Sequence, residues 1–323
     1  MKGKYHIIIE NRRIRYEFTV RRNITIIRGD SATGKTQLLE MLRAFSRQNG
    51  DSGVTLQCER PCIVLDSVQW EHSLQSLSQS IIFIDEGNTF VTSEAFARAV
   101  RSSDNYFVII ARDSLPNLAY SVDEIYGIRT SAKYAGLKKT YNELYHLYGN
   151  VPSDMLSHAE KTVIEDSNAG FSFFEAVFQN RLSCVSAGGK SSIPALVRKE
   201  TDGHTMLVIA DGAAFGAEME NMERLMDAGQ HIALYLPESF EWSILSSGLI
   251  EDREVTEILS HPEDFIESTE YFSWEQYFTA LLVQKTDGTY LKYSKRKLNP
   301  VFLQEKERNA LLGAMPALKP LLE

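Results

Sequence analysis

Residues 26–39, IIRGDSATGKTQLL, decide the fold of the first part of the chain. An apolar run ends at Gly29, and Gly34, Lys35 and Thr36 follow, so that the segment matches the pattern G-x4-G-K-[ST] at every defined position. The glycines of this pattern let backbone N–H groups point at phosphate oxygens, and the helix that follows adds a partial positive charge. The apolar run is typical of a strand and the residues after the loop have helical spacing, which is the context that a phosphate-binding loop requires.

The loop and the first helical turn supply the candidate nucleotide-binding residues. We expect Lys35 to reach the β- and γ-phosphates and the Thr36 hydroxyl to ligate Mg²⁺. ATP is the expected nucleotide, because the chain has no Asn/Thr-Lys-x-Asp motif that would read guanine. The predicted nucleotide-binding residues are Gly29, Asp30, Ser31, Ala32, Thr33, Gly34, Lys35, Thr36 and Gln37.

A second apolar segment, residues 81–86 with the letters IIFIDE, ends in two acids and is expected to complete this site. We expect Asp85 to hold Mg²⁺ through water and Glu86 to polarise the attacking water, and such a doublet favours hydrolysis over binding alone. The next buried strand ends near Arg112, which could sense the γ-phosphate or form an ordinary surface ion pair. The predicted catalytic residues are therefore Glu86, Lys35 and Arg112.

These motifs, together with the hairpin expected at residues 5–20, resemble those of P-loop ATPases of the ABC and AAA+ groups over about residues 1–128. The resemblance implies ATP hydrolysis with Mg²⁺. It also implies a homo-oligomer, since many such ATPases complete their site with a residue from a neighbouring subunit. The chain departs from the ABC pattern because it has no L-S-G-G-Q signature and only 44 residues lie between Thr36 and the acidic strand. We therefore expect a compact, divergent P-loop domain.

A second pattern of alternating strands and helices begins near residue 159. The strand KTVIED carries Glu165 near its end, and the strand TMLVIADG carries Asp211. Carboxylates at the ends of neighbouring strands suit Mg²⁺, which prefers hard oxygen ligands, whereas acids that only cap turns or helices are the structural alternative. Glu165 and Asp211 are therefore predicted metal ligands, beside Thr36 and Asp85 in the first domain.

The order of these acids resembles a TOPRIM domain over roughly residues 160–245, and the order of the two domains resembles OLD-type ATPase–TOPRIM nucleases and related anti-phage effectors. The resemblance implies metal-dependent chemistry on nucleic acid. The chain departs from the usual Asp-x-Asp, because Asp211 is followed by Gly212 and Ala213. Three nearby acids could replace the second aspartate, and the sequence does not select among them: Glu218, Glu220 and Glu238.

The expected fold class is α/β, with a P-loop NTPase domain on a mostly parallel sheet that helices cover on both faces. A second, TOPRIM-like α/β domain with a helical C-terminal part follows. The predicted segments are the P-loop ATPase domain (1–130), a connector without a strand (131–158), the TOPRIM-like domain (159–250) and a mostly helical C-terminal extension (251–323).

Composition argues against several classes of protein. The 323 residues are 43% hydrophobic and 24% charged, and no apolar run is long enough to span a membrane. The three cysteines argue against a disulfide framework, so we expect a cytoplasmic protein. Cys58 and Cys62 are expected to be ordinary thiols rather than metal ligands. The net charge of −9 disfavours nonspecific binding to nucleic acid by bulk charge.

A local basic segment could still contact nucleic acid. Residues 289–297, TYLKYSKRK, interleave Tyr290 and Tyr293 with basic side chains. Tyrosines can stack on bases and basic groups can neutralise phosphates, whereas an exposed charged segment without a ligand is the alternative. Residues 188–192, GGKSS, lack the first glycine of a phosphate loop, so we expect a turn before a helix there.

Three hypotheses for function follow. In the first, an ATP-hydrolysing domain is joined to a second domain that acts on or senses nucleic acid, in defence against phages or mobile elements, with metal at Glu165 and Asp211. In the second, the protein is a nucleotide-gated switch or scaffold whose inactive second domain binds a protein partner, which the missing second aspartate favours. In the third, a small-molecule kinase uses the same loop. The Asp85–Glu86 doublet and the lack of an arginine-rich lid disfavour the third.

Overall fold

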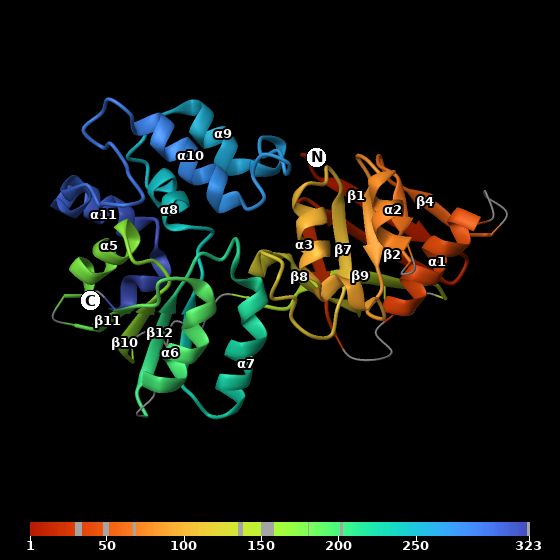
Figure 1. Ribbon diagram of the computed structural model, residues 1–323, viewed down its shortest axis with the longest axis horizontal. Coiled ribbons are helices and arrows are strands. Elements are labelled where there is room, and N and C mark those ends of the chain that lie inside the picture. Colours follow the sequence, from red (N-terminus) through yellow and green to blue (C-terminus); the bar gives the residue numbers. More distant parts are fainter. Residues whose placement is uncertain are drawn as a thin grey trace. The chain divides into compact units, whose positions relative to one another are not determined.

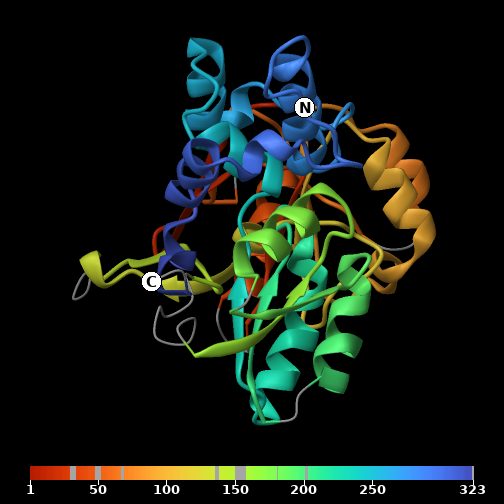
Figure 2. The ribbon, with the colours of Figure 1, turned by 90° about the vertical axis from the view of Figure 1, so that its left-hand side faces the viewer.

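A computed structural model describes residues 1–29, 34–47, 52–66, 69–134, 138–149, 158–179, 181–200 and 203–321 of the chain (Figures 1 and 2). It separates into two compact units. The first consists of Met1–Tyr148 and Glu263–Phe272, and the second of Gly149–Pro262 and Ser273–Glu323.

Part of the expected C-terminal extension belongs to the first unit. The N–H of Gly3 donates to the carbonyl oxygen of Glu263 at 2.6 Å. The amino group of Met1 forms an ion pair with Glu267 and donates to the Ser268 hydroxyl at 2.9 Å. These contacts tie residues 263–272 to the start of the chain, so the extension expected at 251–323 is divided between the two units.

The described part of the first unit contains a nine-stranded sheet in the order β4-β1-β2-β9-β8-β3-β7-β6-β5. The strands from β8 to β5 in that order are parallel, whereas β1 is antiparallel to both of its neighbours, β4 and β2. The expectation of a large, mostly parallel sheet is therefore confirmed. The strands are β1 (Tyr5–Glu10), β2 (Ile14–Val20), β3 (Ile24–Ile27), β4 (Thr55–Gln57), β5 (Cys62–Val64), β6 (Ile81–Ile84), β7 (Tyr106–Ile110), β8 (Ile125–Thr130) and β9 (Thr140–His146).

The connector predicted without a strand does contain one, and the prediction is wrong there. Strand β9 pairs parallel with β2 and antiparallel with β8. Its sequence, TYNELYH, is partly exposed along its length, so it lacks the apolar run by which the buried strands are recognised. Pairing on both sides, rather than local hydrophobicity, makes it a strand.

Helices cover both faces of the parallel part of this sheet. Helix α1 (Lys35–Arg47) buries Leu38, Leu39 and Leu42 in a core with Ile81, Phe83, Val108 and Ile110 of the strands. On the other face, the Phe96 ring of α3 (Glu94–Arg101) packs edge-on against Phe107 of β7, with 6.0 Å between ring centroids. The Ser93 hydroxyl accepts from the Phe96 N–H and so caps α3. The short helix α2 (Trp70–Gln75) precedes β6.

The second unit is built on a parallel sheet in the order β11-β10-β12-β13. The chain leaves β10 toward β11 and then crosses back to β12 and β13, so β10 and β12 flank the point where the winding reverses. Right-handed crossovers place α5 on one face and α6 and α7, which lie side by side, on the other (Figures 1 and 2). The elements are β10 (Ala159–Ile164), α5 (Ala169–Phe178), β11 (Ser183–Ser186), α6 (Ile193–Glu200), β12 (Thr205–Ile209), α7 (Met219–Asp227) and β13 (Ile232–Tyr235).

Further helices follow this sheet: α8 (Phe240–Ser246), α9 (Arg253–Ser260), α10 (Trp274–Thr286) and α11 (Glu305–Gly313). Helix α10 contacts α8 and buries Trp274, Phe278, Leu281 and Leu282. None of the helices in the described ranges is long and apolar enough to cross a membrane.

Candidate functional site

The predicted nucleotide site lies at one edge of the first sheet. Gly29 follows β3, Arg112 follows β7 and Asp85 follows β6, and β7 lies between β3 and β6 in the sheet. Because these strands are parallel, their carboxyl ends meet at the same edge. The structure therefore brings together residues that are far apart in the sequence.

The described ends of the glycine loop have the backbone that the motif requires. The φ angles of Gly29 and Gly34 are 131° and 94°, which lie in the left-handed region that favours glycine. The Tyr16 hydroxyl donates to the Gly34 carbonyl oxygen at 2.8 Å, and a Cβ atom on Gly34 would lie 2.7 Å from that hydroxyl. Position 34 thus needs glycine for its dihedral angle and for the approach of Tyr16. Asp30, Ser31, Ala32 and Thr33 lie outside the described residues.

Lys35 begins α1 and connects the two ends of the loop. Its side chain is buried, and its ammonium donates to the Gly29 carbonyl oxygen. The next residue, Thr36, is exposed, and Gln37 is half-buried. A lysine ammonium and the first N–H groups of a helix are the groups that bind phosphate in such loops.

The predicted water-polarising acid is paired with the predicted sensor. Arg112 donates to Glu86 through both arms of its guanidinium, with Nε–Oε2 at 3.0 Å and Nη2–Oε1 at 2.7 Å. The hydrogen bond from Arg112 lowers the pKa of Glu86 against the opposing effect of burial, and the charges of Arg112 and Lys35 lower it further. Lys35, at the start of α1, therefore also acts on the charge of Glu86. Of the two roles open to Arg112, the structure shows the ion pair.

Asp85 is positioned by its own strand end and by α1. It accepts from the Glu86 N–H at 2.9 Å, and its other oxygen lies 3.5 Å from the guanidinium of Arg43 on α1. A carboxylate and a threonine hydroxyl are hard oxygen donors of the kind that Mg²⁺ takes, so Asp85 and Thr36 fit a nucleotide-bound Mg²⁺ by their chemistry. They would hold the ion, which would neutralise charge on the phosphates.

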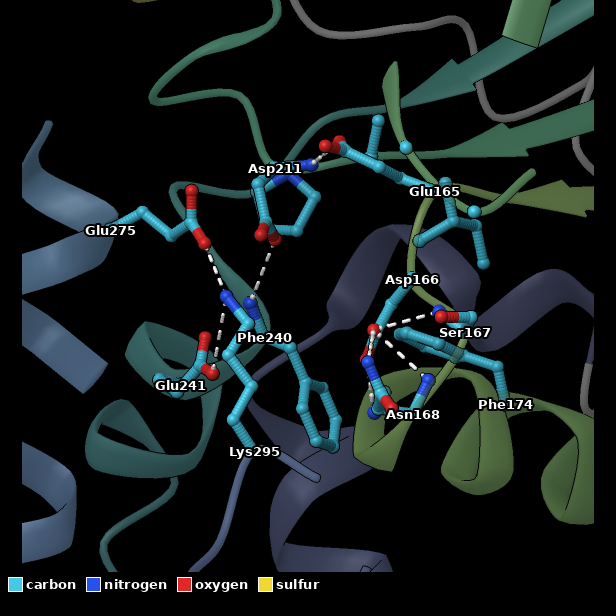
Figure 3. A pocket seen from close by; sticks show the side chains of 16 residues that line it. Glu165, Asp166, Ser167, Asn168, Phe174, Asp211, Phe240, Glu241, Glu275 and Lys295 are labelled. Atoms are coloured by element: carbon cyan, nitrogen blue, oxygen red, sulfur yellow. Dashed lines mark hydrogen bonds and ion pairs between the residues drawn. The ribbon is translucent and has the colours of Figure 1, made fainter. Parts of the chain in front are cut away.

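A pocket of about 190 Å³ opens in the second unit where the winding of its sheet reverses (Figure 3). Ligand sites of parallel sheets form at this place, at the carboxyl ends of the strands. Glu165 and Asp211 both line it, after β10 and β12, so the structure brings the two predicted metal ligands together. Asp166, Glu241 of α8, Glu275 of α10 and Lys295 complete the charged lining.

The two predicted ligands are held by backbone donors. Glu165 Oε2 accepts from the Asp211 N–H at 3.0 Å, and Asp211 Oδ1 accepts from the Phe240 N–H at 3.2 Å (Figure 3). Burial raises the pKa of both acids, and the charges of Glu275, Glu241 and Glu165 raise that of Asp211 further. Within the described ranges, no group of three or more His, Cys, Asp or Glu side chains is arranged to hold a metal. Metal at Glu165 and Asp211 remains a prediction that this arrangement does not favour.

Lys295 is the cation of this pocket. Its ammonium forms an ion pair with Glu275 and lies 3.9 Å from Glu241. Glu241 is buried and also accepts from the Tyr293 hydroxyl at 2.8 Å. Burial lowers the pKa of Lys295, but the carboxylates of Glu241 and Glu275 outweigh it and raise that pKa above its usual range.

The predicted basic and aromatic segment 289–297 does not form one continuous surface. Tyr293 is buried against Glu241 and cannot stack on a base, so that part of the interpretation is wrong. Lys295 turns into the acidic pocket, and Lys292 pairs with Asp287 at 3.0 Å. Tyr290 is 60% exposed. Contact with nucleic acid through the exposed part of the segment stays a prediction.

None of the three acids considered as a second metal ligand lines this pocket. Glu218 is buried beside Asn221, and Glu220 pairs with Arg224. Lys190, in the glycine turn that was expected before a helix, donates to the Ala214 carbonyl oxygen at 2.6 Å. The residues missed from the sequence are Tyr16, Glu241, Glu275 and Lys295.

One of the missed residues leaves a signal in the sequence. Glu241 lies three and four positions before Ile244 and Leu245, which are buried on α8. A carboxylate on the apolar face of a helix needs a partner, so this spacing predicts a buried ion pair.

No family model matches the chain, and no curated protein matches it significantly. The resemblance to P-loop ATPases and TOPRIM domains therefore rests on the motifs themselves, and function must be argued from the two sites.

Proposed function

We propose that the first unit binds and hydrolyses ATP with Mg²⁺, using Lys35, Thr36, Asp85 and Glu86. The observation that supports this most directly is the meeting of the glycine loop and the acid doublet at the carboxyl edge of three adjacent parallel strands. Neither element alone distinguishes a nucleotide site from a turn or an exposed strand end. Their placement at one edge is what phosphoryl transfer to water requires.

Each residue has a physical role in this proposal. Lys35 and the N-terminal N–H groups of α1 neutralise phosphate charge, and Thr36 and Asp85 hold the Mg²⁺ that accompanies ATP. Glu86, whose pKa is lowered, is ionised near neutral pH and can accept a hydrogen bond from the attacking water. Arg112 donates hydrogen bonds to Glu86, and its guanidinium can turn toward the γ-phosphate as negative charge develops there during the reaction.

For the second unit, two roles proposed from the sequence remain. In one it acts on or senses nucleic acid, and in the other it is an inactive module that binds a protein partner when ATP is bound. The lysine within the acidic pocket favours the second role, because an ammonium ion among the carboxylates competes with the divalent ion that phosphodiester cleavage needs.

Phosphate release from ATP and GTP tests the first proposal. Wild type, Lys35→Ala and Glu86→Gln are compared with Glu94→Gln, a control at an exposed acid on α3. We expect Mg²⁺-dependent ATP hydrolysis that Glu94→Gln leaves unchanged. Lys35→Ala should lose nucleotide binding, and Glu86→Gln should retain binding and lose turnover. Equal hydrolysis by Glu86→Gln and wild type would remove Glu86 from the mechanism.

Plasmid DNA and total tRNA distinguish the two roles of the second unit. The chain is incubated with Mg²⁺ or Mn²⁺, with and without ATP, beside Glu165→Ala. ATP-dependent cutting that disappears in the variant would establish a nuclease. If neither substrate is cut, the partner-binding role is favoured. The next experiment is then to isolate proteins that bind the chain in the presence of ATP but not in its absence.

A further inference from the structure

The acidic pocket of the second unit carries its own counter-ion. Five acids line it, Glu165, Asp166, Asp211, Glu241 and Glu275, and Lys295 is the basic residue among its lining residues (Figure 3). Asp166 accepts from the N–H groups of its own loop. So many carboxylates in a partly enclosed space cannot all stay ionised unless protons or cations compensate them. The Lys295 ammonium pairs with Glu275 and lies 3.9 Å from Glu241, and the charge of Asp211 also helps to raise its pKa.

The neighbouring groups hold these carboxylates in place. The Tyr293 hydroxyl fixes Glu241, and backbone N–H groups fix Glu165 and Asp211. The Lys295 carbonyl oxygen accepts from the N–H of Ala169 at 3.2 Å, which anchors the segment that carries the ammonium. The ion pair is therefore part of a built network and not a chance contact of a surface lysine.

From this network we infer that the Lys295 ammonium holds the position that a divalent cation would take in this pocket. The native chain then binds no divalent metal at Glu165 and Asp211, and removal of the ammonium opens a metal site lined by carboxylate oxygens. Such oxygens are the ligands that Mg²⁺ and Mn²⁺ prefer, once the competing positive charge is gone. This inference concerns the second unit and does not depend on ATP hydrolysis by the first.

A titration with Mn²⁺ tests the inference. Mn²⁺ is added to the whole 323-residue chain without nucleotide, and the loss of the electron paramagnetic resonance signal of the free ion measures how much of it is bound. The variants are Lys295→Met and, as a matched control, Lys297→Met at an exposed lysine two positions away. We expect wild type and Lys297→Met to bind Mn²⁺ only weakly. Lys295→Met should gain a site at least about tenfold tighter, and Lys295→Met combined with Asp211→Asn should lose it again.

Two results would overturn the inference. The first is a tight Mn²⁺ site in wild type that Asp211→Asn removes, because a native metal would then displace Lys295. The second is a folded Lys295→Met variant that binds Mn²⁺ no better than Lys297→Met. Thermal melting shows whether Lys295→Met is folded. If it is not, the comparison of wild type with Asp211→Asn still decides the question, since it needs no change at Lys295.

Discussion

The two units place acids at the ends of parallel strands in opposite electrostatic environments. In the first unit, Glu86 lies at an open edge and pairs with Arg112, whose side chain is 65% exposed, and its pKa is lowered. In the second, Glu165 and Asp211 face a pocket, and burial raises the pKa of both. The first edge presents the ionised carboxylate of Glu86 at an open surface, whereas the second gathers several carboxylates around the Lys295 ammonium.

An acid that follows a buried strand therefore predicts where a site lies in the fold, but it does not predict whether that acid is ionised or what it binds. Both sites follow a buried apolar strand, and both were predicted from that pattern. What separates them is the cation that the rest of the fold supplies. Arg112 follows the adjacent strand β7 and is exposed to solvent, whereas Lys295 comes from the far C-terminal part of the chain and turns its ammonium toward Glu241 and Glu275 in the pocket.

The largest effect that would sharpen this contrast is expected at Glu86. Replacement of Glu86 by Gln removes the carboxylate but keeps its shape, so ATP turnover should fall about 10²- to 10⁴-fold, the range of a general base, while nucleotide affinity changes little. Single-turnover hydrolysis and equilibrium binding separate the two quantities. The paired variant Glu165→Gln should leave turnover at the wild-type level. A comparable loss in both variants would mean that the two sites are not distinct in function.

A smaller effect, on stability, is expected at Lys295. Its removal leaves Glu241 buried beside the Tyr293 hydroxyl, its remaining side-chain hydrogen-bond partner among the residues that the structure describes. Breaking a buried pair costs about 3–5 kcal/mol, and because the Lys295 side chain is 41% exposed we expect Lys295→Met to lower the free energy of unfolding by about 1–3 kcal/mol. Because the pKa of Lys295 is raised, its charge contributes to stability at neutral pH, and this contribution is lost only as pH rises from the usual pKa of lysine through the raised value. Urea unfolding measures the loss, and Lys297→Met should show none.

The sequence predicted the α/β class, the large, mostly parallel sheet and the strand ends at which the residues of the first site lie, because the relevant signals are local. Apolar runs predict the buried strands, and the spacing of Gly29, Gly34 and Lys35 predicts the glycine loop. Strand β9 has no such signal, and neither does the turn of Lys295 into the second pocket. Lys295 stands in a basic segment that is typical of a solvated surface, and only the packing of α8 and α10 turns it toward Glu241 and Glu275. A local pattern cannot reveal a partner that tertiary packing selects.

The pH dependence of stability tests the buried side of the contrast. The folded chain holds a proton on Asp211 more tightly than the unfolded chain does, because its folded pKa is raised. Stability therefore falls as pH rises from the usual pKa of aspartate through the raised value. Asp211→Asn should flatten this fall, so that the variant is more stable than wild type near neutral pH and gains nothing in acid. Denaturant unfolding of wild type and Asp211→Asn at a series of pH values measures this difference in the free energy of unfolding. A variant less stable at every pH would show that the carboxylate is favourably ionised.

The smallest effect is expected at Arg112 and would sharpen the open side of the contrast. Exposed ion pairs contribute about 0–1 kcal/mol, so Arg112→Ala should change ATP turnover at neutral pH less than about tenfold. Because the hydrogen bond from Arg112 is the main cause of the lowered pKa of Glu86, the acidic limb of the pH–rate profile should move to higher pH in the variant.

Arg98→Ala, which breaks an exposed pair with Glu94 on α3, is the matched control and should leave the profile unchanged. A loss of about 10³-fold or more in Arg112→Ala, with no movement of the acidic limb, would contradict the ion-pair role. It would place the guanidinium on the transferring phosphoryl group, where such losses are typical. The two units would then differ further, because Arg112 would leave Glu86 when a nucleotide binds, whereas Lys295 stays with Glu241 and Glu275.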